Sequence, residues 1–219
     1  MEGSVTAIVI RAEERKDSDY LLRLFSAEGV ISAVMRGVRK VSSKMKFAAQ
    51  PFAFCVYELS GRGEIPVVTG ATQIEDFSGI AEDIVSFSAC SVMLEAARYS
   101  VDAVDCPDSF VSLLKCIKAV LYSAVNPAIV AIKYLQKLLF SSGFFRPEKG
   151  ELPEKDKCII SADKLCKAVA ASRLDELLEI TASDEAINSA LAITADKFEK
   201  FFYCTLSSAR FFTGKKRSV

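Results

Sequence analysis

The spacing of hydrophobic residues changes near residue 80, and this change constrains the fold of the chain more than any other feature. Before residue 80, short runs rich in Val, Ile, Phe and Tyr occupy residues 5–11, 20–26, 30–36, 52–59 and 67–75. Turn-forming residues separate these runs, as expected for β-strands. From Ile80 onward, apolar residues recur with the 3.6-residue period of a helix. The sequence therefore predicts a β domain over residues 1–79 and a helical domain over residues 80–219.

Five short strands in about 80 residues suit a small closed barrel, for which the OB-fold is the commonest five-stranded arrangement. The Glu28-Gly29 pair lies between two apolar runs and predicts a hairpin. In the run 52–59, one face carries Phe52, Phe54 and Val56 and the other carries Cys55, Tyr57 and Leu59, which indicates a strand covered on both faces. We predict an α+β chain: an OB-fold barrel followed by a helical bundle. An SH3-like barrel is the alternative.

The helical half carries recognisable start and stop signals. A first helix is expected over about residues 81–100, and Pro107 opens a second. Asn126 and Pro127 predict the N-cap and first residue of a third helix, which should stop before Gly143. Residues 146–157 are charged, contain two prolines and predict a loop. Helical patterns resume near Ser161, again from Ser183, and over the run Thr194–Phe212.

The chain contains no histidine, and this absence excludes several kinds of chemistry. Ser-His and Cys-His catalytic pairs and His-ligated metal sites are impossible without it. The acidic residues are scattered, and no Walker or G-x-G-x-x-G motif occurs. Seven dispersed cysteines without a C-x-x-C pair favour reduced thiols over zinc ligands or disulfides. We expect no enzymatic activity, no catalytic residue, no cofactor and no bound metal.

No apolar run is long enough to span a membrane, and the first residues lack the features of a signal peptide. A cytoplasmic protein without membrane contact is therefore expected.

The net charge is zero, but the cations are not evenly distributed. The segment 36–50 follows one expected strand, precedes another and contains Arg36, Arg39, Lys40, Lys44 and Lys46. Such cations neutralise backbone phosphates, and Phe47 offers a ring for base stacking. The segment is equally consistent with a solvated loop that keeps the protein soluble.

An ordered series of motifs covers about 80 residues of the first half: TAIVIRA, DSDYLLRLFSAEGVISAVMRGVRK, SSKMKFAAQPFAFCVYEL, GRGEI and TQIEDF. This series resembles the bacterial RecO family of recombination mediators. The helical half matches more loosely, through KYLQKLLFSSGFFRPE and LSSARFF.

This resemblance implies an OB-fold joined to a helical domain that together bind single- and double-stranded DNA in DNA repair and recombination. Family members anneal complementary strands and help to load the RecA recombinase onto DNA coated by single-strand-binding protein. They work with RecR and dock the acidic C-terminal tail of the single-strand-binding protein, so association with the nucleoid during repair is implied. By position, the DNA-facing residues would be Arg36, Arg39, Lys40, Lys44 and Lys46, with Arg11, Arg15, Arg23 and Arg62 as weaker candidates. Arg23 interrupts an apolar strand and is expected to point to solvent.

Two further expectations concern the helical half. Many family members carry a four-cysteine zinc motif just after the segment matching 144–147, whereas this chain keeps only Cys158 and Cys166 there, so a plain loop should replace the zinc element. In the run 194–212, aromatic residues, among them Phe201, lie close in sequence to the cations Lys200 and Arg210. The resemblance implies that Lys200, Phe201 and Arg210 receive the acidic tail peptide. The aromatics could instead only fill the bundle core. A general RNA- or single-stranded-DNA-binding OB module without a mediator role is the alternative function.

Overall fold

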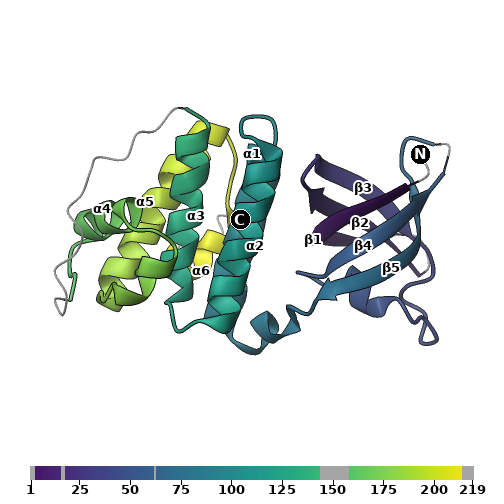
Figure 1. Cartoon of the computed structure of the whole chain (residues 1–219), viewed down its shortest axis with the longest axis horizontal. Helices are drawn as coiled ribbons and strands as arrows, with labels where there is room; N and C mark the ends of the chain where they lie inside the picture. Colours follow the sequence, from purple (N-terminus) through teal and green to yellow (C-terminus); the bar gives the residue numbers. More distant parts are fainter. Residues whose placement is uncertain (1–2, 16–17, 62, 144–157, 214–219) are drawn as a thin grey trace, which may run out of the picture. The chain divides into compact units, whose positions relative to one another are not determined.

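The computed structural model describes residues 3–15, 18–61, 63–143 and 158–213. The chain divides into two compact units, which are described separately below (Figure 1). The first comprises Met1–Gly79 together with Cys106–Phe110, and the second comprises Ile80–Asp105 together with Val111–Val219.

The first unit is a closed barrel of five strands: β1 (Gly3–Arg15), β2 (Asp19–Ser26), β3 (Gly29–Met35), β4 (Phe54–Ser60) and β5 (Val67–Glu75). Their order around the barrel is β1-β2-β3-β5-β4. Only β3 and β5, joined at Val34 and Val67, pair in parallel among the described strands. This order is that of the OB-fold and not of the SH3-like alternative, so the predicted fold class is confirmed.

Strand β1 is long enough to pair with two neighbours, which closes the barrel. Its first half pairs with β4 and its second half with β2, and the register shifts between Val9 and Arg11. A bulge of this kind bends a strand and increases its twist. The predicted hairpin is also present: Ser26 pairs with Gly29 across a two-residue turn, and Gly29 has a φ of 111° that favours glycine.

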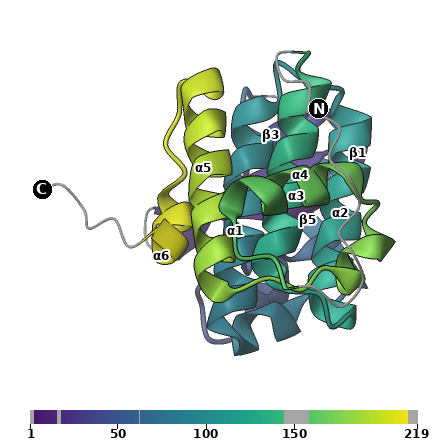
Figure 2. The same ribbon diagram turned by 90° about the vertical axis from the view of Figure 1, so that its left-hand side faces the viewer.

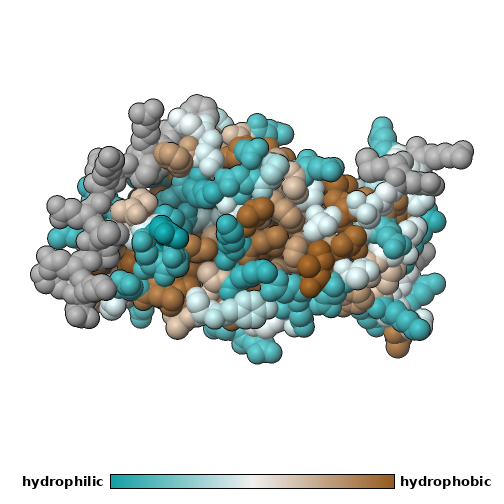
Figure 3. Space-filling model, viewed as in Figure 1, coloured by the Kyte–Doolittle hydropathy of each residue, from teal (hydrophilic) through white to brown (hydrophobic). Residues whose placement is uncertain are grey.

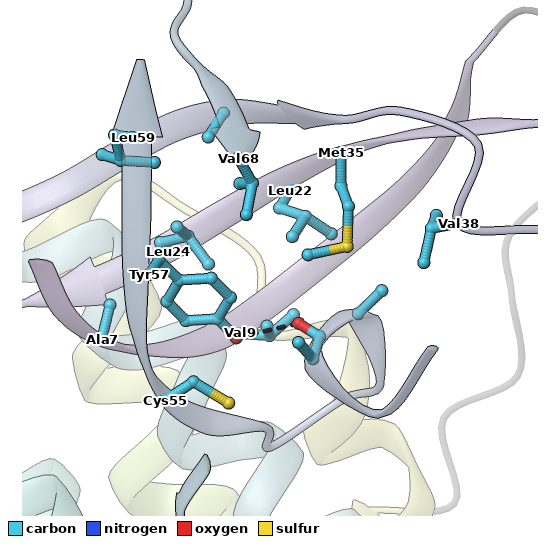
Figure 4. Packing of buried hydrophobic residues seen from close by; sticks show 13 residues of the cluster. Ala7, Val9, Leu22, Leu24, Met35, Val38, Cys55, Tyr57, Leu59 and Val68 are labelled. Atoms are coloured by element: carbon cyan, nitrogen blue, oxygen red, sulfur yellow. Dashed lines mark hydrogen bonds between the residues drawn. The ribbon is translucent and has the colours of Figure 1, made fainter. Parts of the chain in front are cut away.

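The barrel core consists of alternate residues from all five strands, including Leu22, Leu24 and Met35 (Figure 4). On β4, Cys55, Tyr57 and Leu59 face this core. The expectation that β4 is covered on both faces holds only at its start. Phe54 is buried and stacks on Phe77 at 5.9 Å between ring centroids, whereas Glu58 is exposed. Phe52 was expected in this strand but precedes it, with a φ of 66°.

The second unit is a bundle of helices: α1 (Ile84–Ser100), α2 (Cys106–Tyr122, whose first residues belong to the first unit), α3 (Pro127–Ser141), α4 (Ala162–Ala171), α5 (Asp184–Phe202) and α6 (Arg210–Thr213). Four 3-10 helices complete the described elements: η1 (Lys46–Ala49), η2 (Ser78–Glu82), η3 (Asp175–Glu179) and η4 (Ser207–Ala209). Helix α3 contacts α1, α4 and α5, and α4 lies across it in the turned view of Figure 2. As expected, the Asn126 side chain accepts a hydrogen bond from the Ala128 N–H, and Pro127 is the first helical residue.

Two helix predictions need correction. The first helix starts at Ile84 rather than near residue 81, because the Asp83 carboxylate caps it by accepting from the Ser86 N–H. The run Thr194–Phe212 is not one helix. Helix α5 ends at Phe202, Tyr203 adopts the left-handed conformation with a φ of 49°, and the chain continues through η4 into α6. The aromatics of this run are therefore not arranged around a single helix.

The surface mixes polar and apolar residues. On the face seen in Figure 3, hydrophobic residues reach the surface between hydrophilic ones over both units. Among the helices that the structure describes, none combines the length and the apolar character needed to cross a membrane. The expected loop at 146–157 lies outside the described residues.

Candidate nucleic-acid interface

The basic loop, residues 36–46, leaves the barrel directly after β3. It folds as a series of turns, with hydrogen bonds from the Lys40 N–H to the Gly37 carbonyl and from the Ser43 N–H to the Lys40 carbonyl. Val38 inserts into the barrel core and is almost fully buried. The Gly37 N–H donates to the Asp19 carboxylate at 2.7 Å, and Gly37 has a φ of 63°, a conformation that glycine adopts without steric cost. The loop is therefore attached to the barrel at its start.

The end of the loop is attached as well, by the 3-10 helix η1. Ala48 and Ala49 are buried in the barrel core, and the Tyr57 hydroxyl donates to the Ala48 carbonyl at 2.8 Å (dashed line in Figure 4). Burial raises the pKa of Tyr57, so this hydroxyl stays protonated and remains a donor. Because the core holds both Val38 and η1, the basic loop is anchored to the barrel at both ends.

The cations of the basic loop are all exposed, as is Phe47, of which 38% is accessible. They differ in their contacts. Arg39 forms an ion pair with Glu14 at 2.9 Å, and its guanidinium lies 5.9 Å from the centre of the Tyr20 ring. Arg39 therefore joins the loop to β1 and β2 as well as presenting charge. Lys40, Lys44 and Lys46 present their charges on long, exposed side chains, which suits contact with a polyanion.

Arg36 lies beside a cavity at the same end of the barrel. The cavity has a volume of about 350 Å³, and its lining comprises Arg15, Asp19, Val34, Arg36, Ile65 and Val67. These residues come from the end of β1, the start of β2, the end of β3 and the region that leads into β5. The structure thus brings Arg15 next to the basic loop. This proximity is not evident from the sequence, where the two are far apart.

The remaining weaker candidates lie elsewhere. Arg11 and Arg23 are opposite each other on β1 and β2. Arg11 is exposed and forms an ion pair with Glu13 at 2.8 Å. Arg23 was expected to point to solvent, but it is half-buried. Its Nη1 donates to the Ser32 hydroxyl at 3.3 Å, and its Nε is buried without a hydrogen-bond partner. Arg62 lies outside the described residues.

The proposed peptide-binding residues lie at the end of α5 and the start of α6. Lys200 is exposed and forms an ion pair with Asp196 at 2.7 Å, and Phe201 is 41% exposed. Arg210 is half-buried at the first residue of α6. Phe198 and Leu206 are buried and belong to the core, whereas Tyr203 is almost fully exposed. The aromatics of this region thus divide between the core and the surface.

The segment after α5 is held by two carboxylates that sequence reasoning did not single out. The Leu206 N–H donates to Glu199 at 2.7 Å, and the Ser208 N–H donates to Glu95 of α1 at 3.0 Å. On the barrel, Asp19 and Glu14 were missed in the same way. Their only signal in the sequence was that acids lie near basic residues, which does not reveal a particular pairing.

Comparison with known proteins is consistent with this geometry. Residues 1–77 match the family model described as "Recombination protein O N terminal". The chain is 32% identical over 150 residues to the DNA repair protein RecO of Desulfitobacterium hafniense, covering 68% of this chain and 54% of that protein. The chain belongs to the RecO family. The protein of the same name from Heliobacterium modesticaldum is 34% identical over 90 residues, which cover 41% of this chain and 33% of that protein. That of Cutibacterium acnes is 28% identical over 146 residues, which cover 63% and 59%.

The match to RecO proteins is partial in length. The chain spans about half the length of the curated relatives it matches. The family model covers the barrel, and the 150-residue similarity to the Desulfitobacterium protein continues beyond it.

Cys158 and Cys166, the two cysteines expected to remain from a zinc element, have different environments. Cys158 is exposed, and the Cys166 thiol contacts the Ala190 carbonyl and the Thr194 hydroxyl, each at 3.7 Å. Within the described part of the chain, no group of three or more His, Cys, Asp and Glu side chains is placed to hold a metal ion.

Proposed function

We propose that this chain binds DNA, and single strands in particular, as a component of DNA repair and recombination. The observation that carries this proposal is the basic loop held at both ends by an OB barrel in a chain of the RecO family. OB-folds bind oligonucleotides through a barrel face and the loops at its edge. A loop that is anchored at both ends loses less conformational entropy on binding than a free segment does.

The three exposed lysines of the loop, Lys40, Lys44 and Lys46, would contact phosphates. Each contact with a single strand releases counterions and contributes about −0.7 to the slope of log K against log salt. Phe47 would add base stacking, which is independent of sequence because every base has an aromatic face. Binding should therefore depend strongly on salt and weakly on sequence.

The role proposed for the whole protein is that of a mediator rather than an enzyme. It would bind both single- and double-stranded DNA, anneal complementary strands and, with RecR, help RecA onto DNA coated by single-strand-binding protein at the nucleoid. Annealing needs no catalytic group. Cations that neutralise phosphates reduce the repulsion between two approaching strands. The similar proteins are named DNA repair protein RecO, which supports a role in repair.

The test replaces Lys40, Lys44 and Lys46 together with Ala and measures binding to a fluorescent oligonucleotide over a range of salt concentrations. The salt slope should become shallower by about 2, from three lost contacts, and annealing of complementary oligonucleotides should slow in parallel. The matched control replaces Lys115, Lys118 and Lys164, which are exposed on α2 and α4, and should bind as the wild type does. An unchanged slope in the loop variant would contradict the proposal. Equal affinity for RNA of the same length, without annealing, would favour the general OB module.

The second part of the proposal places the tail of single-strand-binding protein at Lys200, Phe201 and Arg210. Lys200 and Phe201 are consecutive at the end of α5, and Arg210 begins α6, which contacts α5. Cations and an exposed ring on such a surface can hold carboxylates while they cover an apolar side chain. Calorimetry with the tail peptide should give micromolar affinity that weakens with salt and decreases in Lys200→Glu and Arg210→Glu. Because Lys200 already pairs with Asp196, Asp196→Asn should strengthen binding. Binding that is unaffected by all three changes would place the peptide elsewhere.

A further inference from the structure

The cavity beside the basic loop has the composition of a small binding site. Its volume of about 350 Å³ is within the range of small-molecule pockets, roughly 300–1,000 Å³. Its lining combines three polar residues, Arg15, Asp19 and Arg36, with three apolar residues, Val34, Ile65 and Val67.

The strand register explains why the two arginines lie together. Arg15 is directly opposite Asp19 in the pairing of β1 with β2, and Tyr20 is opposite Met35 in the pairing of β2 with β3. Continuing this register by one residue brings Arg36 beside Asp19. Residues opposite each other in antiparallel strands extend from the same face of the sheet. Asp19 therefore lies between Arg15 and Arg36 in the strand register, and one of its carboxylate oxygens accepts from the Gly37 N–H.

We propose that this cavity holds one nucleotide of a single DNA strand, with its phosphodiester between Arg15 and Arg36 and its base against Ile65 and Val67. This inference rests on the proposed DNA binding. It specifies the part of the strand that the barrel would hold, namely one phosphodiester and one base. Guanidinium groups donate two parallel hydrogen bonds to a phosphate and fix its orientation. A base held against aliphatic side chains has left its stack, which is least costly in a strand that is already single.

The charge of the site favours an internal phosphate over a terminal one. The two arginines and Asp19 give a net charge of +1, which matches the single negative charge of a phosphodiester. A terminal phosphate carries about −1.5 to −2 at neutral pH, and the Asp19 carboxylate would repel the additional charge. Ile65 is 42% exposed, so a base can reach it from solvent.

The experiment follows isoleucine methyl resonances of the full chain during titration with an eight-residue deoxythymidine oligonucleotide at low salt. The Ile65 methyl should shift, whereas Ile84 and Ile160, which are exposed in the other unit, provide internal controls and should not. In the double variant R15Q/R36Q the Ile65 shift should disappear, affinity should fall at least about tenfold, and the salt slope should become shallower by about 1.4, from two contacts. The control variant K115Q/K164Q should match the wild type.

The outcomes separate the two proposals. If the oligonucleotide saturates the protein while Ile65 stays unchanged, the cavity is not the site, although DNA binding stands. If R15Q/R36Q binds as the control does, the arginines do not hold the phosphate. If thymidine 5′-monophosphate shifts Ile65 at lower concentration than the dinucleotide TpT, the assignment to a phosphodiester is wrong. If the oligonucleotide does not bind at all, the proposed function fails together with this inference.

Discussion

Lys133 of α3 offers a direct test of what holds helix α4 in the bundle. Its ammonium donates to the carbonyls of Val169 at 3.0 Å and Ala170 at 3.3 Å, and also to that of Ser172. These carbonyls lie at the C-terminal end of α4, where backbone acceptors have no partner within the helix. A cation at this position also interacts favourably with the helix dipole.

Replacing Lys133 with Met keeps most of the side-chain volume and removes the charge. Each hydrogen bond to a charged group contributes about 1.5–3 kcal/mol, and the dipole interaction contributes about 0.3–1 kcal/mol. Desolvation offsets much of this gain, since burial lowers the pKa of Lys133 and thus disfavours its charged form. We expect the free energy of unfolding to fall by about 2 kcal/mol, which corresponds to a Tm lower by about 4–8 °C.

Urea unfolding followed by far-UV circular dichroism measures this change. Lys164→Met, on the exposed surface of α4, is the control and should stay within about 0.5 kcal/mol of the wild type. A Lys133→Met variant as stable as that control would refute the reasoning, because the three carbonyls would then be satisfied equally well by water.

Four further outcomes follow from the sequence and the structure. Tyr57→Phe removes the hydrogen bond to Ala48 and should lower the free energy of unfolding by about 1 kcal/mol in urea titration; no change would mean that η1 is held by packing alone. Burial raises the pKa of Cys90 and Cys116 from 9.0 to about 12. The unfolded chain loses these protons at a lower pH than the folded chain does, so the free energy of unfolding should fall as pH rises from about 9 to 12. Cys90→Ala should make this decline less steep, and an identical pH profile for the variant would contradict the reasoning. In native protein at pH 8, a thiol reagent should modify the exposed Cys158 well before either buried cysteine. Metal analysis of protein purified without chelators should show well below one zinc per chain, and stoichiometric zinc would require a ligand set built from the dispersed cysteines.

The β half could be predicted closely from sequence because its signals are local. Alternating apolar residues define which side chains enter the core, and the turn residues between them limit each strand. The five expected runs correspond to β1–β5, and the hairpin expected from Glu28-Gly29 is present, with its turn one residue earlier at Ala27–Glu28. The helical half was predicted less well where it depended on long-range contacts. Aromatic residues continue past Phe202 without a break in composition, so the periodicity extended the helix to Phe212.

The candidate site shows the same difference between local properties, which the sequence reveals, and long-range contacts, which it does not. The sequence by itself determined that Arg36, Lys40, Lys44 and Lys46 are exposed cations in one loop, since charge and the position between two strands are local properties. Only the tertiary structure decided which of the other arginines join them. Arg15 reaches Arg36 because antiparallel pairing brings the end of β1 and the end of β3 to the same edge of the barrel on either side of Asp19. Arg23 meets Ser32 for the same reason, because the register of β2 and β3 places them opposite each other. Arg39 meets Glu14 because the basic loop folds back against β1, a contact between segments far apart in sequence.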